Sequence, residues 1–210
     1  MKPYFQHFIT SEEELRARIG TPSERASKKV IHHLDEGCQQ FIAHSPFLTI
    51  ATANDKGICD SSPRGDMPGF VYVLDENVLV IPERPGNKRG DSIKNILTNP
   101  HVGLIFFIPG ISESLRVNGK ASIICDEDVL EKMKVNDKLP LMGIAVEVEE
   151  CFMHCGKALK RSNLWEPSTW LREEEQPNTA QILSTHVKIP EMTPERLKAD
   201  FEEGYKTKLY

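Results

Sequence analysis

The sequence of 210 residues lacks a long apolar segment, an excess of basic residues and an even set of cysteines. No apolar run approaches the ~20 residues that cross a bilayer, and the start at Met1 lacks the apolar core of a secretion signal. The formal net charge of −5 argues against non-specific attraction to nucleic acid or anionic membranes. Five irregularly spaced cysteines fit reduced thiols better than a disulfide framework. We therefore expect one cytoplasmic domain without disulfides and without a nucleic-acid or membrane partner.

Several catalytic and nucleotide-binding signatures are absent as well. The sequence has no Gly-x-x-x-x-Gly-Lys-Ser/Thr motif, and no Gly-x-Gly-x-x-Gly follows a predicted strand. Its motifs assemble neither a Ser-His-Asp triad nor a pair of catalytic carboxylates. These absences argue against nucleotide hydrolysis, Rossmann-type NAD binding and ordinary hydrolase chemistry.

Helix signals dominate the first 44 residues. A capping box at residues 11–14 starts one helix, and Thr-Pro-Ser-Glu at residues 21–24 starts a second with proline in its first turn. The second helix should end before Ser45, since Pro46 follows. Its apolar stripe, suited to packing on a sheet, consists of Ile31, Leu34, Cys38, Phe41 and Ile42.

From residue 47 the pattern changes to short apolar runs separated by turn residues. The predicted strands are 47–53, 58–62, 69–74, 78–82, 102–108, 114–125 and 142–148, with a short helix at 91–97. Closely spaced strands predict a mainly β fold with flanking helices, an antiparallel barrel of about six strands. Helical pieces follow at 154–161 and 194–203. We divide the chain into a helical segment packing on the barrel (1–44), the barrel core (45–150) and a C-terminal helical extension of the same domain (151–210).

The segment 81–92 holds the clearest candidate binding site. It leaves a strand, turns through proline and glycine, and opens a helix. Such a turn directs free backbone N–H groups and the positive end of the helix dipole at one point, which suits a phosphate. Arg84, Lys88 and Arg89 add positive charge, and Arg64 on the preceding hairpin would reach the same point if the strands are neighbours.

An alternative interpretation of these cations remains open. Arg89 could be an ordinary surface residue paired with Asp91 or with Glu83. The spacing of the residues does not distinguish the two interpretations.

The order of motifs closely resembles the pyridoxamine 5′-phosphate oxidase-like superfamily of FMN-binding split barrels, in particular its branch of FMN-dependent proteins of unknown substrate. The motifs that carry the resemblance are Ser-Ser-Pro-Arg-Gly-Asp at 61–66, Pro-Gly-Phe at 68–70, Ile-Pro-Glu-Arg-Pro-Gly-Asn at 81–87, Arg89, Asp-Ser at 91–92, Asn-Ile at 95–96, Leu-Arg-Val-Asn-Gly at 115–119, His-Cys-Gly-Lys-Ala at 154–158 and Arg-Ser-Asn-Leu-Trp at 161–165. The resemblance implies a six-stranded antiparallel split barrel. It also implies a homodimer with FMN in the cleft between the subunits.

By resemblance, Arg64 and the turn 87–89 would hold the FMN phosphate, and Pro82 would lie along the flavin ring. The full set of implied cofactor residues is Arg64, Pro82, Arg84, Asn87, Lys88, Arg89, Ser92, Arg161 and Trp165. The C-terminal Trp-x-Arg-Leu-x-Pro motif with which the oxidase binds pyridoxal phosphate is replaced here by residues 206–210, Lys-Thr-Lys-Leu-Tyr. This difference argues against oxidation of vitamin B6 and leaves the cofactor site intact.

The segment 151–155 contains two cysteines and a histidine, but a structural zinc site needs a second ligand cluster, which the sequence does not offer. We therefore predict no metal. On a helix, His154, Lys157 and Arg161 would share one face and approach the flavin or substrate across the dimer. His154 could donate a proton there, or could be a packed, hydrogen-bonded histidine. With Arg116, His154 and Lys157 are the candidate catalytic residues that would orient a substrate.

Two classes of function remain. The first is an FMN-dependent oxidoreductase that acts on an unknown small molecule. The second is a non-enzymatic module that binds or senses flavin or haem. Deazaflavin F420 is a third cofactor choice, but it needs an extended basic groove, and the compact cluster at 84–89 favours FMN.

Overall fold

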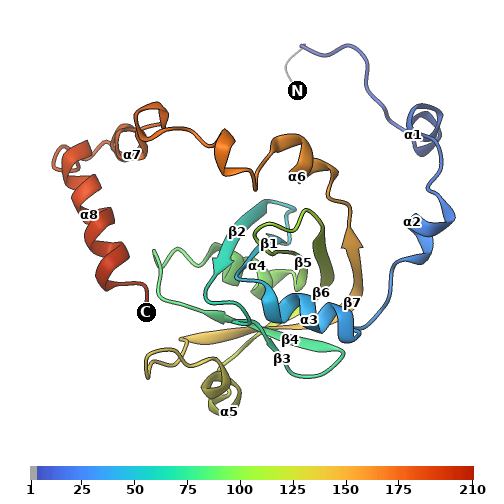
Figure 1. Cartoon of the computed structure of the whole chain (residues 1–210), viewed down its shortest axis with the longest axis horizontal. Helices are drawn as coiled ribbons and strands as arrows, with labels where there is room; N and C mark the ends of the chain where they lie inside the picture. Colours follow the sequence, from blue (N-terminus) through green and yellow to red (C-terminus); the bar gives the residue numbers. More distant parts are fainter. Residues whose placement is uncertain (1–3) are drawn as a thin grey trace.

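The computed structural model describes residues 4–210. The first three residues, which belong to the segment where we expect no secretion signal, lie outside this range. One sheet of seven strands forms the centre, in the order β2-β1-β5-β6-β7-β4-β3, and every neighbouring pair is antiparallel (Figure 1). The strands are β1 (Phe47–Ala53), β2 (Cys59–Gly65), β3 (Tyr72–Val73), β4 (Val78–Glu83), β5 (His101–Phe107), β6 (Ser114–Ile124) and β7 (Met142–His154). The predicted antiparallel fold with flanking helices is confirmed, whereas the predicted number of six strands is wrong, because the two-residue β3 pairs with β4 as a seventh.

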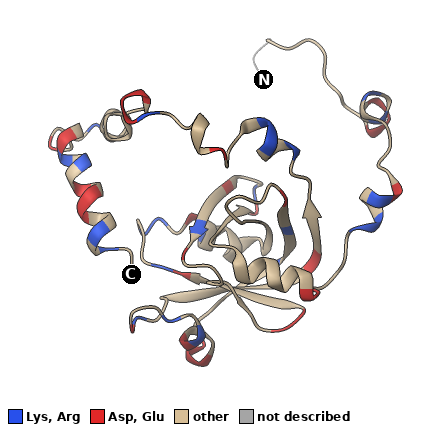
Figure 2. Ribbon diagram, in the orientation of Figure 1, with Lys and Arg blue, Asp and Glu red and all other residues tan. Residues whose placement is uncertain are grey.

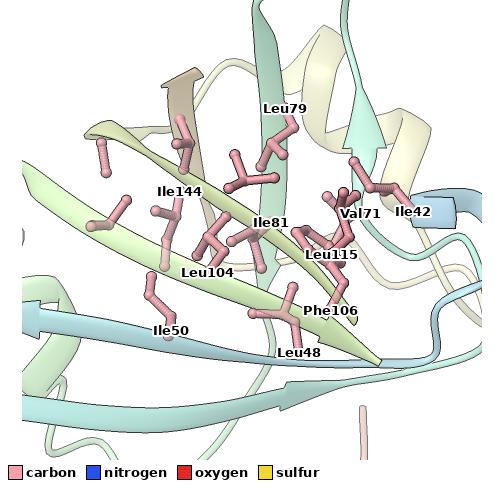
Figure 3. Packing of buried hydrophobic residues seen from close by; sticks show 14 of the residues in the cluster. Ile42, Leu48, Ile50, Val71, Leu79, Ile81, Leu104, Phe106, Leu115 and Ile144 are labelled. Atoms are coloured by element: carbon pink, nitrogen blue, oxygen red, sulfur yellow. The ribbon is translucent and has the colours of Figure 1, made fainter. Parts of the chain in front are cut away.

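The sheet curves around a core built from alternating strand residues. In β1 and β5 every second side chain is buried, as period-two strands require. Leu48 lies opposite Phe106 and Ile50 opposite Leu104, and all of these side chains are fully buried. Figure 3 shows them packed with Leu115 and residues of β4 and β7. This core fixes the strand register, since a shift by one residue would turn the apolar side chains to solvent.

The hairpin of β6 and β7 is longer than predicted. β7 runs from Met142 to His154 and does not end at residue 148, because it stays paired with β6 as far as Ser114 opposite His154. The predicted helix at 154–161 is therefore wrong at its start: His154 is a strand residue, and α6 covers only Lys157–Ser162. His154 consequently does not share a helical face with Lys157 and Arg161.

The N-terminal segment forms three helices, α1 (Glu12–Ile19), α2 (Glu24–Lys28) and α3 (Glu36–His44). The helix expected from residue 21 to residue 44 is interrupted: Ile31 pairs with Cys151 as an isolated bridge, and Asp35 caps a new helix by accepting from the Cys38 N–H. Only α3 buries side chains against the sheet, where Cys38 and Ile42 join the core. α1 and α2 bury no residue.

On the other side of the core, α4 (Asp91–Thr98) packs against β1, β2 and β6. α5 (Glu127–Leu130) and a 3₁₀ turn (Glu131–Met133) lie between β6 and β7. After α6, two 3₁₀ turns (Pro167–Thr169, Glu173–Glu175) lead to α7 (Thr179–Val187) and α8 (Pro194–Thr207), which pack on each other. The helices α1 and α2 and the pair α7 and α8 lie away from the sheet (Figure 1), whereas the last residue, Tyr210, returns to contact Asp66. No helix within residues 4–210 is long and apolar enough to span a membrane.

Candidate functional site

A cavity of about 610 Å³ lies where β2, the end of β4 and the start of α4 meet. Its wall comprises residues 62–65, 82–94, Phe70, Leu141 and Met142. Most of the predicted cofactor residues line it, namely Arg64, Pro82, Arg84, Asn87, Lys88, Arg89 and Ser92. Arg64 of β2 lies beside the turn after β4, but the condition set for this prediction is not met, because β2 and β4 are not neighbours in the strand order and the curvature of the sheet brings them together. In Figure 2 this turn carries blue segments, which mark its basic residues.

The turn from β4 to α4 is shaped for an anion. Lys88 and Gly90 have positive φ values of 61° and 63°, and Gly90 is the N-cap of α4 without any side-chain cap. The Asn87 Oδ1 accepts from the Arg89 N–H at 3.0 Å and so closes the turn locally. Since no side chain caps α4, its first N–H groups are left for another acceptor. The predicted strand, turn and helix over residues 81–92 are confirmed.

Arg64 is firmly held at the cavity wall. Its side chain is only 17% exposed, and its Nε donates to the Glu83 Oε2 at 3.1 Å. One terminal N–H group donates to the Pro63 carbonyl at 2.9 Å. The guanidinium is thus fixed at the wall, with further N–H groups free to bind a ligand.

Arg89 and Lys88 stand at the surface. Arg89 is 72% exposed, and its Nε donates to the Asp91 Oδ2 at 2.7 Å. This ion pair raises the pKa of Arg89 and lowers the pKa of Asp91. The alternative pairing of Arg89 with Asp91 is therefore present. Within residues 4–210 Lys88 forms no ion pair, which leaves its charge for a ligand.

Arg84 lines the cavity, but its guanidinium is engaged elsewhere. Its Nε donates to the buried Asp66 carboxylate at 2.9 Å, and its Nη2 donates to the Met133 carbonyl at 2.8 Å. The Tyr210 hydroxyl donates to the other Asp66 oxygen at 2.6 Å, and the Tyr210 ring covers the guanidinium at 5.7 Å. The bond to Asp66 raises the pKa of Tyr210. Arg84 is thus part of a wall shared with a second cavity of about 560 Å³.

The remaining predicted residues lie outside the 610 Å³ cavity. Arg116 of β6 lies opposite Phe152 of β7, with its guanidinium 5.5 Å from the ring centre, and the Lys29 Nζ lies 4.8 Å from the same centre. His154 follows two residues later on β7. Lys157 and Arg161 lie on the exposed α6, and the Trp165 indole N–H donates to the Ile111 carbonyl at 2.9 Å. The structure therefore separates these residues from the turn between β4 and α4 of the same chain.

The segment 151–155 gives no sign of a metal centre. Cys151 is buried, with its sulfur 3.3 Å from that of Cys38, whereas Cys155 is exposed. Over the described range 4–210, no three His, Cys, Asp or Glu side chains are grouped closely enough to hold an ion.

We expect His154 to titrate below the ordinary histidine midpoint of 6.5. Partial burial lowers its pKa first, and the positive charges of Arg116 and Lys29 lower it further. The neutral imidazole therefore prevails at pH 7, which suits hydrogen bonding better than donation of a proton from imidazolium. Because the unfolded chain binds this proton more tightly, protonation costs folding stability as the pH falls below about 6.5.

An NMR titration of the histidine ring protons measures this midpoint, with His154→Gln to assign the signal. Arg116→Met should raise the midpoint, because one positive charge is removed. A midpoint at or above 6.5 in the unsubstituted protein would contradict the described surroundings of His154.

Comparison with known proteins matches residues 34–155 to the family model described as pyridoxamine 5′-phosphate oxidase. No curated protein sequence matches the chain. Among solved structures, HupZ from Group A Streptococcus has 17% sequence identity and a TM-score of 0.47, with 57% of this chain and 92% of HupZ covered. An FMN-binding protein from Syntrophomonas wolfei has 9% identity and a TM-score of 0.45 (58% and 86% covered). HutZ, a heme storage protein from Vibrio cholerae, has 14% identity and a TM-score of 0.38 (57% and 93% covered).

Proposed function

Because the chain belongs to the pyridoxamine 5′-phosphate oxidase family, we propose that it binds FMN in the 610 Å³ cavity and works as an FMN-dependent oxidoreductase on a small molecule. The whole cavity wall lies within the matched residues 34–155. The observation that carries the proposal is the meeting of Arg64 with the uncapped start of α4 in one cavity. The cavity volume lies within the range typical of small-molecule sites.

The polar end of the cavity fits a phosphate monoester. Arg64 supplies guanidinium N–H groups, Lys88 supplies an ammonium group, and α4 supplies backbone N–H groups with the positive end of its dipole. Ser62 and Ser92 belong to the same wall. A phosphate bound here would be held by charge and by hydrogen bonds together.

The apolar part of the wall fits a flat ring. It includes Pro82, Phe70, Leu141 and Met142, and apolar surfaces of this kind favour the burial of an aromatic system. When bound, FMN supplies the redox chemistry, and the protein supplies position, electrostatics and exclusion of water. The two carboxylates of the wall, Glu83 and Asp91, are each paired with an arginine, so neither is free to act as a base.

We propose that the residues outside the cavity serve the site of a second copy. Arg116, His154, Lys157, Arg161 and Trp165 cannot serve the cavity of their own chain as the structure stands, since none of them lines it. In a homodimer these residues would complete the site of the second copy. Arg161 and Trp165 would contact its cofactor, and the other three would orient its substrate as candidate catalytic residues.

Exposed apolar side chains on both ends of the chain support dimerisation. Tyr4, Phe5 and Phe8 expose more than half of their surface, and so do Trp170 and Leu171. Large apolar side chains exposed in this way are often covered on association. A cytoplasmic location is part of the proposal, since the five cysteines are all free thiols.

A non-enzymatic role in binding flavin or haem is the alternative. The observation that favours it is the lack of a free acid or base in the cavity wall, where both carboxylates are ion-paired. Rapid reduction of the bound flavin by NADH or NADPH supports the oxidoreductase. A tightly bound flavin that resists these and other physiological reductants would contradict the oxidoreductase and favour the binding role.

Purification without added cofactor tests the proposal first. We expect a yellow protein with the visible absorption of oxidised flavin, from which denaturation releases a compound with the mass of FMN. If the protein is colourless, it should take up FMN and should bind riboflavin, which lacks the phosphate, more weakly. A protein that neither carries nor takes up FMN would overturn the cofactor assignment.

A further inference from the structure

Three polar side chains meet beneath the phosphate end of the cavity. The Asp60 Oδ2 accepts from the Ser62 hydroxyl at 2.7 Å and from the Ser92 hydroxyl at 3.0 Å, and the two hydroxyl oxygens lie 3.1 Å apart. Ser92 is 2% exposed. Both serines line the cavity, whereas Asp60 is not part of its wall. One carboxylate oxygen thus holds both hydroxyl groups.

These contacts join the two halves of the proposed phosphate site. In β2 the side chains of Asp60, Ser62 and Arg64 alternate with exposed neighbours and so share one face of the strand. Ser92 belongs to the first turn of α4, directly after the turn that carries Lys88 and Arg89. Asp60 therefore fixes the start of α4 to the strand that presents Arg64.

The negative charge of the same carboxylate would repel a bound phosphate. Among residues 4–210, no lysine or arginine forms an ion pair with Asp60, although its charge adds to the larger effect of Asp91 in raising the pKa of Arg89. Two hydroxyl donors satisfy the carboxylate without neutralising it. A phosphate bound at the start of α4 would thus experience repulsion from Asp60.

We propose that Asp60 is a positioning residue for the cofactor phosphate, with two opposite effects. Through its hydrogen bonds to Ser62 and Ser92 it aligns the start of α4 with Arg64, which strengthens binding. Through its charge it weakens binding of the same phosphate. The inference rests on the proposed function, since it assumes that a phosphate occupies this end of the cavity.

Two substitutions at Asp60 separate these effects. Asp60→Asn keeps a side-chain carbonyl oxygen to accept from the serines but removes the charge, so FMN should bind at least about threefold tighter than to the unsubstituted protein. Asp60→Ala removes the acceptor as well, so FMN should bind about tenfold more weakly than to Asp60→Asn. Asp55→Asn, in the turn between β1 and β2, removes a charge away from the cavity and serves as the matched control.

Three readouts distinguish positioning from a general structural role. Affinity for riboflavin should stay the same in both Asp60 variants, because riboflavin has no phosphate to align or repel. In 1 M salt the higher FMN affinity of Asp60→Asn relative to the unsubstituted protein should shrink, since this difference is electrostatic. The lower FMN affinity of Asp60→Ala relative to Asp60→Asn should persist. Ser92→Ala provides a second variant in case Asp60→Ala does not fold, and it should weaken FMN binding but not riboflavin binding.

The outcomes separate this inference from the proposed function. If the unsubstituted protein does not bind FMN, the proposed function fails. If it binds FMN but Asp60→Asn and Asp60→Ala have equal affinities, or if Asp60→Asn binds more weakly than the unsubstituted protein, the role given to Asp60 is wrong. Unchanged FMN affinity in Ser92→Ala would likewise overturn it.

Discussion

Replacing Arg64 with methionine should lower the affinity for FMN by about a hundredfold, the largest effect of any single substitution in the cavity. Hydrogen bonds from a charged donor contribute about 1.5–3 kcal/mol, and each 1.4 kcal/mol changes an affinity about tenfold. Arg64 is 17% exposed, so solvent screens its charge little. Its loss would also leave Glu83, 23% exposed, without its partner and facing the phosphate.

The neighbouring Glu83 provides the control for this experiment. In the double variant Arg64→Met with Glu83→Gln, the unpaired negative charge is gone, so part of the lost affinity should return. Arg89→Ala should weaken binding by about tenfold only, because Arg89 is 72% exposed and already paired with Asp91. Titration with FMN followed by flavin fluorescence gives all three affinities. Equal FMN affinities of the Arg64→Met variant and the unsubstituted protein would place the phosphate elsewhere.

Local sequence signals predicted the parts of the site that are close in the chain. Proline and glycine between an apolar run and a polar helix start marked the turn at 84–90, and the structure has β4 before it and α4 after it. Arg64 was assigned to the same place on the condition that its strand neighbours β4, and through the order of motifs. The two strands are not paired; the curvature of the whole sheet brings Arg64 to Glu83, and no single segment encodes that curvature.

Tertiary pairing overrode local propensity where the prediction failed. Residues 154–161 have helical spacing, but β6 offers partners up to Ser114, so β7 continues to His154. The apolar stripe from Ile31 to Ile42 predicted one helix, yet Ile31 hydrogen-bonds with Cys151 and leaves the helix to begin after Asp35. In both places a partner strand supplied backbone hydrogen bonds that the isolated segment lacks.

Side-chain contacts between distant residues left no signal in the sequence. Tyr210 reaches Asp66 across 144 positions, and Ser92 reaches Asp60 across 32. The binding motifs identified Arg84 as a cation near a phosphate, whereas its partners Asp66 and Met133 became apparent only in the folded chain. Residue types at a site are thus easier to predict than the ion pairs that decide which of their charges remain free.

Gly119 is the position where the smallest substitution should have the largest effect on stability. It lies at the register shift between Asn118 and Gly119 in the long β6–β7 hairpin. A methyl group added there would overlap the backbone carbonyl of Glu147 on the partner strand. Since backbone cannot rotate away as a side chain can, the two strands would have to separate or slip. Gly119→Ala should therefore cost about 3 kcal/mol or more of folding free energy, or lower the Tm by about 6–12 °C.

Thermal and urea unfolding of Gly119→Ala and Gly37→Ala test this expectation as a matched pair. At Gly37, in α3, the added carbon would lie 3.5 Å from the Asp35 Oδ1, an ordinary contact, and alanine favours the helix by up to about 1 kcal/mol. Gly37→Ala should therefore be neutral or stabilising, which would show that an extra methyl group alone does not unfold the protein. If Gly119→Ala proves as stable as Gly37→Ala, the close approach of β6 to β7 is absent. The bulge that sets the register of Arg116 and His154 would then lie elsewhere on the hairpin.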